Sequence, residues 1–274
     1  THYRSIFISD IHLGSRGSKA AAVNKFLKNH TCEHLYLVGD IVDFWALRRK
    51  SFFPQSHVNV VRRILKRANT AKVYYIVGNH DEALRSFIPM TFGQIDLVNE
   101  VVHQTADGRE FLVIHGDQYD QVMLYAKWLA FLGDVGYTLL MRANGAVNTF
   151  RRWFGFGYWS LSAYAKRKVK VAVNFIGQFE DAVAHDVRQR GLDGVICGHI
   201  HHAEVKTLPG NFTYLNCGDW VESCTALVEH SDGRLELLTF PAIVDETLDP
   251  AEDERPRSSS PDFEPAFPTF PPFV

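Results

Sequence analysis

Five short polar clusters recur along the chain, and each directly follows a short apolar run of the kind that forms a β-strand. The clusters are rich in aspartate, histidine, asparagine and glycine: Asp10-Ile11-His12, Gly39-Asp40-Ile41-Val42-Asp43, Gly78-Asn79-His80-Asp81, His115-Gly116-Asp117 and Gly198-His199-Ile200-His201-His202. Ligands bind beyond the carboxyl ends of the strands in open α/β sheets. The order therefore predicts that all five clusters meet at one edge of a sheet.

The remaining pattern is typical of an α/β protein. We predict strands over residues 4–8, 35–38, 73–77, 111–114, 194–197, 212–216, 225–230 and 234–240. Helical periodicity covers residues 19–29 and 57–68, and Asp107-Gly108 and Asp232-Gly233 are typical hairpin turns. Alternating strand–helix units followed by a run of strands indicate a layered α/β sandwich.

Two segments differ from this pattern. Residues 121–190 are mostly helical in pattern, and residues 121–179 hold eight Lys or Arg beside one acid, Asp134. We interpret 121–190 as a helical insertion within a domain spanning 1–244. Residues 245–274 hold seven of the 11 prolines and eight acids. Such a composition buries little apolar surface, so it predicts a disordered acidic, Pro-rich tail, whose phenylalanines could alternatively form a docking segment.

The five clusters offer carboxylate, imidazole and amide groups, which suit divalent metals such as Mn, Fe, Co or Zn. In an extended strand residues i and i+2 point to the same side, so Asp10 with His12, and His199 with His201, could each hold one centre or two adjacent ones. The flanking glycines permit the sharp turns that bring ligands inward. One such cluster is typical of an ordinary loop, but five in order predict a metal site.

This series resembles the calcineurin-like metallophosphoesterase superfamily over about residues 4–240. The resemblance implies a layered α-β-β-α metallophosphoesterase sandwich with two divalent metal ions. The implied metal ligands are Asp10, His12, Asp40 and His201 at one metal, with Asp40 bridging to a second that is also held by Asn79, His115 and His199. His80 matches the histidine that approaches the scissile phosphate in this superfamily.

The implied reaction is hydrolysis, in which a hydroxide bridging the metals attacks phosphorus. His80 would stabilise the developing charge or protonate the leaving group. Asp81 could orient the imidazole of His80, and Asp43 or Asp117 could hold metal ligands from behind. Each of these three carboxylates could equally cap a loop.

Within the superfamily, the long insertion and Gly218-Asp219-Trp220 are similar to the UDP-2,3-diacylglucosamine diphosphatase family, a group of Mn enzymes of lipid A synthesis with a helical lid for acyl chains. The resemblance implies a lid over 121–190 that binds substrate, in addition to Asn79, through Arg151, Arg152, Ser160, Lys166, Lys168 and Lys170. The alternative for this segment is a helical pair with a solvated basic face. The chain departs from that family at His80, where arginine is usual, and over Ser160–Lys170, where the match is loose.

Three functions follow from these readings. The first is a Mn-dependent hydrolase of UDP-2,3-diacylglucosamine or a similar lipid-linked nucleotide diphosphate, cytoplasmic and peripheral to the inner membrane. The second keeps the metals but acts on a soluble phosphodiester or phosphomonoester. A non-catalytic scaffold is disfavoured because every ligand position is present.

Four cysteines without C-x-x-C spacing favour reduced residues and a cytosolic location. No apolar run is long enough to span a membrane, and no recognised module predicts nucleic acid as a partner.

Overall fold

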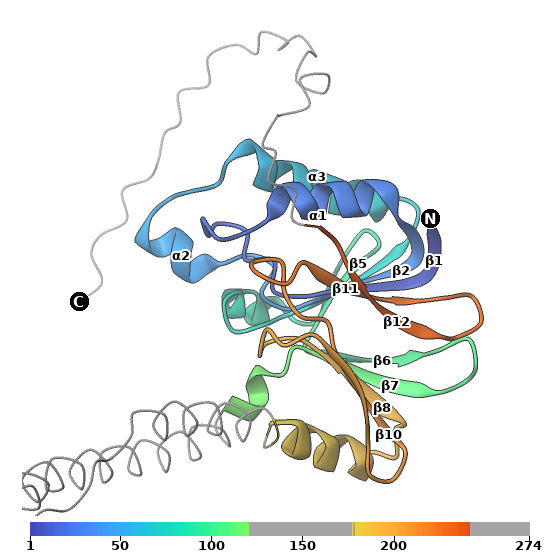
Figure 1. The fold of residues 1–274 in the computed structure, drawn as a ribbon. Coiled ribbons are helices and arrows are strands. Elements are labelled where there is room, and N and C mark those ends of the chain that lie inside the picture. The colour runs from blue at the N-terminus through green and yellow to red at the C-terminus, as the bar shows by residue number, and fades with distance from the viewer. Residues whose placement is uncertain (121–176, 178, 242–274) are drawn as a thin grey trace, which may run out of the picture. The chain divides into compact units, whose positions relative to one another are not determined.

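The computed structural model describes residues 1–120, 177 and 179–241. Its strands form a seven-stranded sheet in the order β12-β11-β1-β2-β3-β5-β4 and a five-stranded sheet in the order β6-β7-β8-β10-β9 (Figure 1). The first sheet comprises β1 (His2–Ile8), β2 (Thr31–Val38), β3 (Lys72–Ile76), β4 (Met90–Phe92), β5 (Ile95–Val98), β11 (Thr225–Glu229) and β12 (Leu235–Thr239). The second comprises β6 (Glu100–Gln104), β7 (Glu110–Ile114), β8 (Gly194–Cys197), β9 (Glu204–Leu208) and β10 (Phe212–Asn216).

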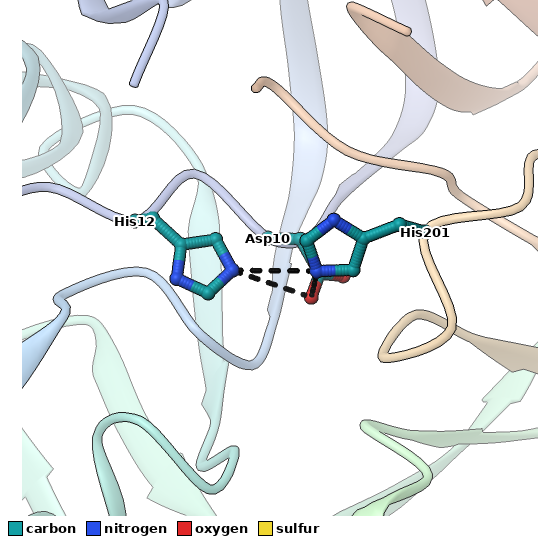
Figure 2. Close-up of side chains that lie close together, drawn as sticks. All are labelled: Asp10, His12 and His201. Atoms are coloured by element: carbon teal, nitrogen blue, oxygen red, sulfur yellow. Dashed lines mark hydrogen bonds and ion pairs between the residues drawn. The ribbon is translucent and has the colours of Figure 1, made fainter. Parts of the chain in front are cut away.

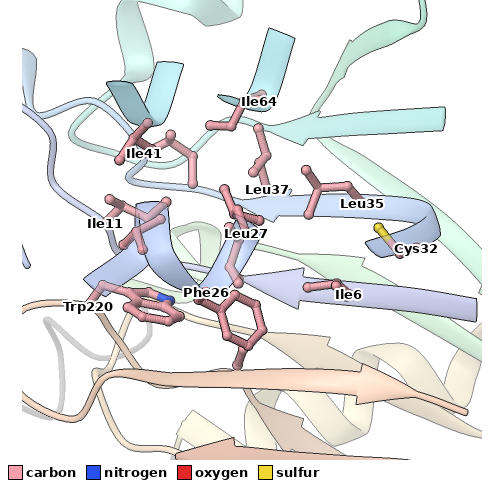
Figure 3. Packing of buried hydrophobic residues seen from close by; sticks show 14 of the residues in the cluster. Ile6, Ile11, Phe26, Leu27, Cys32, Leu35, Leu37, Ile41, Ile64 and Trp220 are labelled. Carbon is pink, nitrogen blue, oxygen red and sulfur yellow. The ribbon is translucent and has the colours of Figure 1, made fainter. Parts of the chain in front are cut away.

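Helices cover the outer faces of both sheets. Helices α1 (Ala20–Asn29) and α3 (Gln55–Arg67) are the crossovers that make β1, β2 and β3 parallel. They pack on the first sheet in a core that includes Phe26, Ile64 and Trp220 (Figure 3). Residues 179–189 form a helix whose apolar side, including Val183, packs on the second sheet. The predicted α/β layering of helices and sheets is confirmed.

A third core lies between the two sheets. Phe7 and Tyr36 of the first sheet pack in one cluster with Phe111 and Ile196 of the second, and Phe7 stacks on Tyr36 with ring centroids 4.5 Å apart. Strands buried on both faces read as continuous apolar runs rather than as alternating patterns. This explains why continuous apolar runs such as residues 35–38 were recognisable as strands.

The predicted arrangement of the clusters at one sheet edge is wrong in one respect. The clusters at Asp10, Asp40 and Asn79 follow β1, β2 and β3 of the first sheet, whereas those at His115 and His199 follow β7 and β8 of the second. An apolar run does not reveal which sheet it joins, so the sequence could not separate the two sets. The carboxyl ends of both groups of strands nevertheless meet.

Four strands and one α-helix of the described residues were absent from the prediction: β4, β5, β6, β9 and the short helix α2 (Phe44–Arg49). Strand β4 is exposed throughout, and α2 has no buried residue, so neither shows a hydrophobic period. Asp43 caps α2, because its carboxylate accepts a hydrogen bond from the Ala46 amide at 2.7 Å. None of the helices among the described residues combines the length and apolar content that crossing a bilayer requires.

Candidate metal centre

The predicted ligands lie in strained loops just beyond the strands. Asp10, His12, Asp40, His199 and His201 have φ angles of +52°, +53°, +54°, +69° and +52°. This left-handed region is uncommon for residues other than glycine, and strain of this kind concentrates at functional sites. The prediction that extended-strand geometry aligns Asp10 with His12 is therefore wrong, since β1 already ends at Ile8. The loop conformation turns both side chains inward instead.

One group of ligand atoms is formed by Asp10, His12 and His201 (Figure 2). The Asp10 Oδ1 atom lies 3.1 Å from His201 Nε2 and 3.8 Å from His12 Nε2, and the two imidazole nitrogens are 3.4 Å apart. Asp10 Oδ1 is buried and has no hydrogen bond in the structure. A buried carboxylate oxygen without a bond, facing two imidazole nitrogens, is the arrangement expected around a cation.

Asp40 faces two sets of ligand atoms with its two oxygens. Its Oδ2 atom lies 3.8 Å from His12 Nε2 and 4.0 Å from His80 Nε2, while its Oδ1 atom lies 3.5 Å from His115 Nε2. Asn79 adds its Oδ1 atom 3.2 Å from the same His115 nitrogen. Asp40 is thus placed to be shared between a site with His12 and a site with His115.

His199 is directed elsewhere. Its Nε2 atom lies 2.6 Å from Asp120 Oδ1, although its ring packs edge-on against His115 with centroids 5.0 Å apart. The sequence analysis missed Asp120, which follows the His115 cluster without belonging to any recognisable motif. His199 remains the one predicted ligand whose imidazole is bonded away from the others.

Groups behind the ligands fix their orientation. The Nδ1 atom of His115 donates to the Val38 carbonyl at 3.0 Å, because a carbonyl only accepts, and this leaves Nε2 as the metal-binding atom. Asp43 lies 3.5 Å from His12 Nδ1 and 3.0 Å from His80 Nδ1. The capping role foreseen for Asp43 is seen in its hydrogen bond to α2, and its support of metal ligands stays a prediction.

The contacts of Asp81 are those of a loop cap. Its carboxylate accepts hydrogen bonds from the amides of Gly78 and Ile41 and from the Tyr75 hydroxyl, at 2.6, 3.0 and 2.7 Å. These bonds join the loop after β3 to the loop after β2. The imidazole of His80 is held by Asp43 and not by Asp81 among the described residues. The other carboxylate, Asp117, forms an ion pair with Arg85.

Two glycines allow the loops to approach closely. A Cβ atom on Gly78 would lie 2.3 Å from Asp40 Oδ1, and one on Gly198 would lie 2.5 Å from Asp10 Oδ2. Both distances are far shorter than van der Waals contact permits. Any side chain at either position would therefore displace a predicted ligand.

The buried carboxylates of the cluster stabilise positive charge within it. Burial disfavours charge on His115, but its hydrogen bond to Asp40 and the nearby charges of Asp10 and Asp40 raise its pKa to about 10. Burial likewise opposes ionisation of Asp10, yet the close approach of the His12 and His201 imidazoles holds the pKa of Asp10 below its ordinary range. The carboxylates thus favour protonation of the neighbouring imidazoles. Bound cations would replace these protons, because metal ions bind to neutral histidines. The donor set fits divalent metal ions.

Further residues frame this site or fall outside the description. Trp45 of α2, which the sequence analysis also missed, packs its indole on the His80 imidazole with ring centroids 4.2 Å apart. The predicted substrate contacts of the lid lie outside the described residues: Arg151, Arg152, Ser160, Lys166, Lys168 and Lys170. The predicted tail lies outside them as well.

Comparison with known proteins gives a consistent result. The model of the calcineurin-like phosphoesterase family matches residues 3–203. A UDP-2,3-diacylglucosamine hydrolase from Shewanella sp. (strain ANA-3) is 25% identical over 87% of this chain and 99% of its own length. The enzyme of the same name from Aliivibrio fischeri (strain MJ11) is 26% identical over 83% of this chain and 94% of its own.

Solved structures show a more distant likeness. Vps29 from Entamoeba histolytica aligns with 86% of this chain and 99% of its own, at a TM-score of 0.41 and 14% identity. At these values the likeness carries no argument about function. The family match covers well over half of the chain, and the clustered carboxylates and imidazoles are the groups that its chemistry needs. The chain therefore belongs to the calcineurin-like phosphoesterase family and is a metal-dependent phosphoesterase.

Proposed function

We propose that this phosphoesterase hydrolyses a phosphate anhydride in UDP-2,3-diacylglucosamine or a similar lipid-linked nucleotide diphosphate, using two Mn ions. The observation that carries the two-metal proposal is the position of Asp40, whose oxygens face His12 on one side and His115 on the other. A carboxylate between two donor sets is suited to bridging two cations. Asp10 and His201 would complete one site, and Asn79 and His199 the other, once His199 leaves Asp120.

The side chains around this centre suit hydrolysis at phosphorus. Bound divalent cations supply charge stabilisation at the phosphoryl oxygens and a water of lowered pKa. His80 presents Nε2 toward the centre, while Asp43 at its Nδ1 fixes the tautomer and the orientation of the ring. His80 is thereby placed to deliver a proton from Nε2 to the leaving oxygen.

The substrate part of the proposal rests on the relatives. Both are named for UDP-2,3-diacylglucosamine and align over nearly their whole length. We assign the lid cations Arg151, Arg152, Lys166, Lys168 and Lys170, with Ser160, to the phosphates of such a substrate. Its acyl chains would sit in a bilayer, and we propose that the protein acts at the cytoplasmic face of the inner membrane.

The test is release of UMP from UDP-2,3-diacylglucosamine by the Mn-loaded protein. We expect activity in the unmodified chain and its loss in Asp40→Asn and His201→Gln. His202→Gln is the matched control, because His202 is an exposed neighbour whose only ion-pair contact among the described residues is Glu204 at 3.9 Å. Absence of UMP release from a protein that still hydrolyses a chromogenic diester would refute the substrate assignment.

One observation favours the alternative, a soluble phosphodiester or phosphomonoester. His80 is the residue of the wider superfamily, where the UDP-2,3-diacylglucosamine enzymes usually carry arginine. Removing residues 121–176 separates the two proposals. Under the lipid proposal this deletion abolishes hydrolysis of lipid substrate and spares the chromogenic diester, whereas under the alternative the natural soluble substrate is unaffected.

A further inference from the structure

Two segments of the described chain contain basic residues and no acidic ones. Residues 11–32 hold four Lys or Arg and residues 44–80 hold eight, without a single Asp or Glu in either. The whole chain has a net charge of −2, so this is a strong local asymmetry. These two segments build α1, α2 and α3.

The basic side chains of α1 and α3 point away from the protein core. The two helices lie side by side on the outer face of the first sheet (Figure 1). Their inner sides are buried, whereas Lys25 and Lys28 of α1 and Arg62 and Lys66 of α3 are exposed. Positions three or four apart share one side of a helix, so Lys25 and Lys28 lie on one side of α1, and Arg62 and Lys66 lie on one side of α3.

Helix α2 and the loops before α1 and after α2 carry further exposed cations, and the two loops meet where the Arg16 guanidinium lies 5.0 Å from the Phe52 ring centroid. We name this set the basic helical face: Arg16, Lys19, Lys25, Lys28, Arg48, Arg49, Lys50, Arg62 and Lys66. None of the nine forms an ion pair with any residue that the structure describes. Within the part of the chain that the structure describes, the charge of this face is therefore not neutralised by an acidic side chain.

Large apolar side chains stand exposed among these cations. Leu65 of α3 is 45% exposed, Phe53 is 39% exposed and Trp45 of α2 is 38% exposed. A helix surface that combines Lys and Arg with exposed Leu, Phe and Trp is typical of proteins that lie on the interface of an anionic membrane. A nucleic acid would neutralise the cations but would leave Leu65 in water.

The α2 part of the basic helical face adjoins the metal centre. Trp45, between Asp43 and the Arg48–Lys50 run, packs directly on His80. A surface bound through α2 would thus lie beside the imidazole assigned to the leaving group. The contact between Trp45 and His80 therefore connects α2 to the side chain that we assign to the leaving oxygen.

We infer that the basic helical face docks the enzyme on an anionic phospholipid bilayer. This deepens the proposed function and rests on it in one respect, namely that a membrane-embedded substrate gives the docking its purpose. Lys and Arg supply the attraction to lipid phosphates, and Leu65, Phe53 and Trp45 enter the interface. The residues of the face all lie outside the predicted lid, residues 121–190.

The test compares two variants with the same change in net charge, using the full chain. In the first, Lys25, Lys28, Arg62 and Lys66 become Gln; in the control, Arg109, Arg188, Arg190 and Arg234, which lie outside the face, become Gln. Binding is measured by flotation with vesicles of phosphatidylglycerol and phosphatidylcholine, and with phosphatidylcholine alone. Each cation near an anionic surface is worth about fivefold in affinity, so we expect a loss on the order of several hundredfold in the first variant.

The outcomes separate this inference from the substrate assignment. We expect the control to bind like the unmodified chain, Leu65→Ser to bind roughly tenfold more weakly, and hydrolysis of a soluble chromogenic diester to persist in every variant. The inference would be overturned if both quadruple variants bound the vesicles equally well. It would also be overturned if the unmodified chain bound neutral vesicles as tightly as anionic ones, or bound duplex DNA more tightly than anionic vesicles at the same salt concentration. Vesicle binding that depends on the face, in a protein that releases no UMP, would refute the substrate assignment and leave the docking surface standing.

Discussion

Glu229 is a buried carboxylate that joins the two sheets, and its removal tests the packing between them. Its Oε1 atom accepts hydrogen bonds from Arg4 at 2.6 Å and from the Ala106 amide at 2.8 Å. Its Oε2 atom accepts from the Ser5 hydroxyl at 2.6 Å and lies 2.9 Å from His103 Nε2. Glu229 and Ser5 belong to the first sheet and His103 to the second, and Glu229 has no exposed surface.

The structure sets the size of the effect. Burial alone would raise the pKa of Glu229, but hydrogen bonds from His103, Ser5 and Ala106 outweigh it and lower the pKa from 4.5 to about 2. A difference of this size between the unfolded and folded chain corresponds to about 3 kcal/mol. Because the folded-state pKa is the lower one, this stabilisation is complete above about pH 4.5 and is lost as the pH falls toward 2.

We therefore expect Glu229→Gln to lower the free energy of unfolding by about 3 kcal/mol at pH 7 and to flatten its dependence on pH between 5 and 2. Urea-induced unfolding followed by circular dichroism at a series of pH values measures both. The matched control is Glu236→Gln, which removes a carboxylate paired with His230 and Arg234 but 41% exposed, and whose effect should be small because solvent screens it. A Glu229→Gln protein that unfolds in acid with the same pH dependence as the unmodified chain would refute the reasoning.

Three further changes test the metal centre. Asp43→Asn removes the carboxylate behind both His12 and His80, so we expect roughly a 10- to 100-fold loss in activity or metal affinity. Diester turnover and metal content measure these two quantities. Unchanged values for both would contradict the proposal that Asp43 supports the two imidazoles. Gly198→Ala forces a Cβ to 2.5 Å from Asp10 Oδ2, so bound metal should fall on elemental analysis while the circular dichroism spectrum is retained, and full metal occupancy would argue against the close approach. Chelation should abolish diester hydrolysis and lower the melting temperature, both reversibly, because a ligand that binds only the folded chain stabilises it; hydrolysis that survives exhaustive chelation would contradict a metal-dependent reaction.

Much of this architecture was predictable because strand burial and ligand chemistry both leave local patterns. The apolar runs before Asp10, Asp40, Asn79, His115 and His199 each proved to be a strand that ends within a few residues of its polar cluster. The hairpin turn at Asp232-Gly233 also connects two predicted strands, β11 and β12, and the turn at Asp107-Gly108 leads into the predicted β7 from β6, which was not predicted. These features depend on a few neighbouring residues, and local sequence determines them.

Features that depend on distant contacts were not predictable. The short helix α2 is specified by its cap at Asp43 rather than by a buried side, and Trp45 gains its role only by packing on His80. Asp120 bonds to a histidine 79 positions away. Asp81 shows the same limit, since a carboxylate beside His80 looks like its partner in the sequence while its oxygens in fact hold the backbone of two loops.

The strained loops indicate how folding and metal binding are divided in this protein. Five predicted ligands hold left-handed backbone conformations, each at a cost of roughly 1 kcal/mol or more. Three hydrophobic cores, one of them between the sheets, are available to offset that cost before any cation binds. Imidazoles that take up protons can meanwhile neutralise Asp10 and Asp40 in the absence of metal. The fold can therefore present a nearly complete donor set, in which only His199 must change partner, and chelation should remove activity without unfolding the chain.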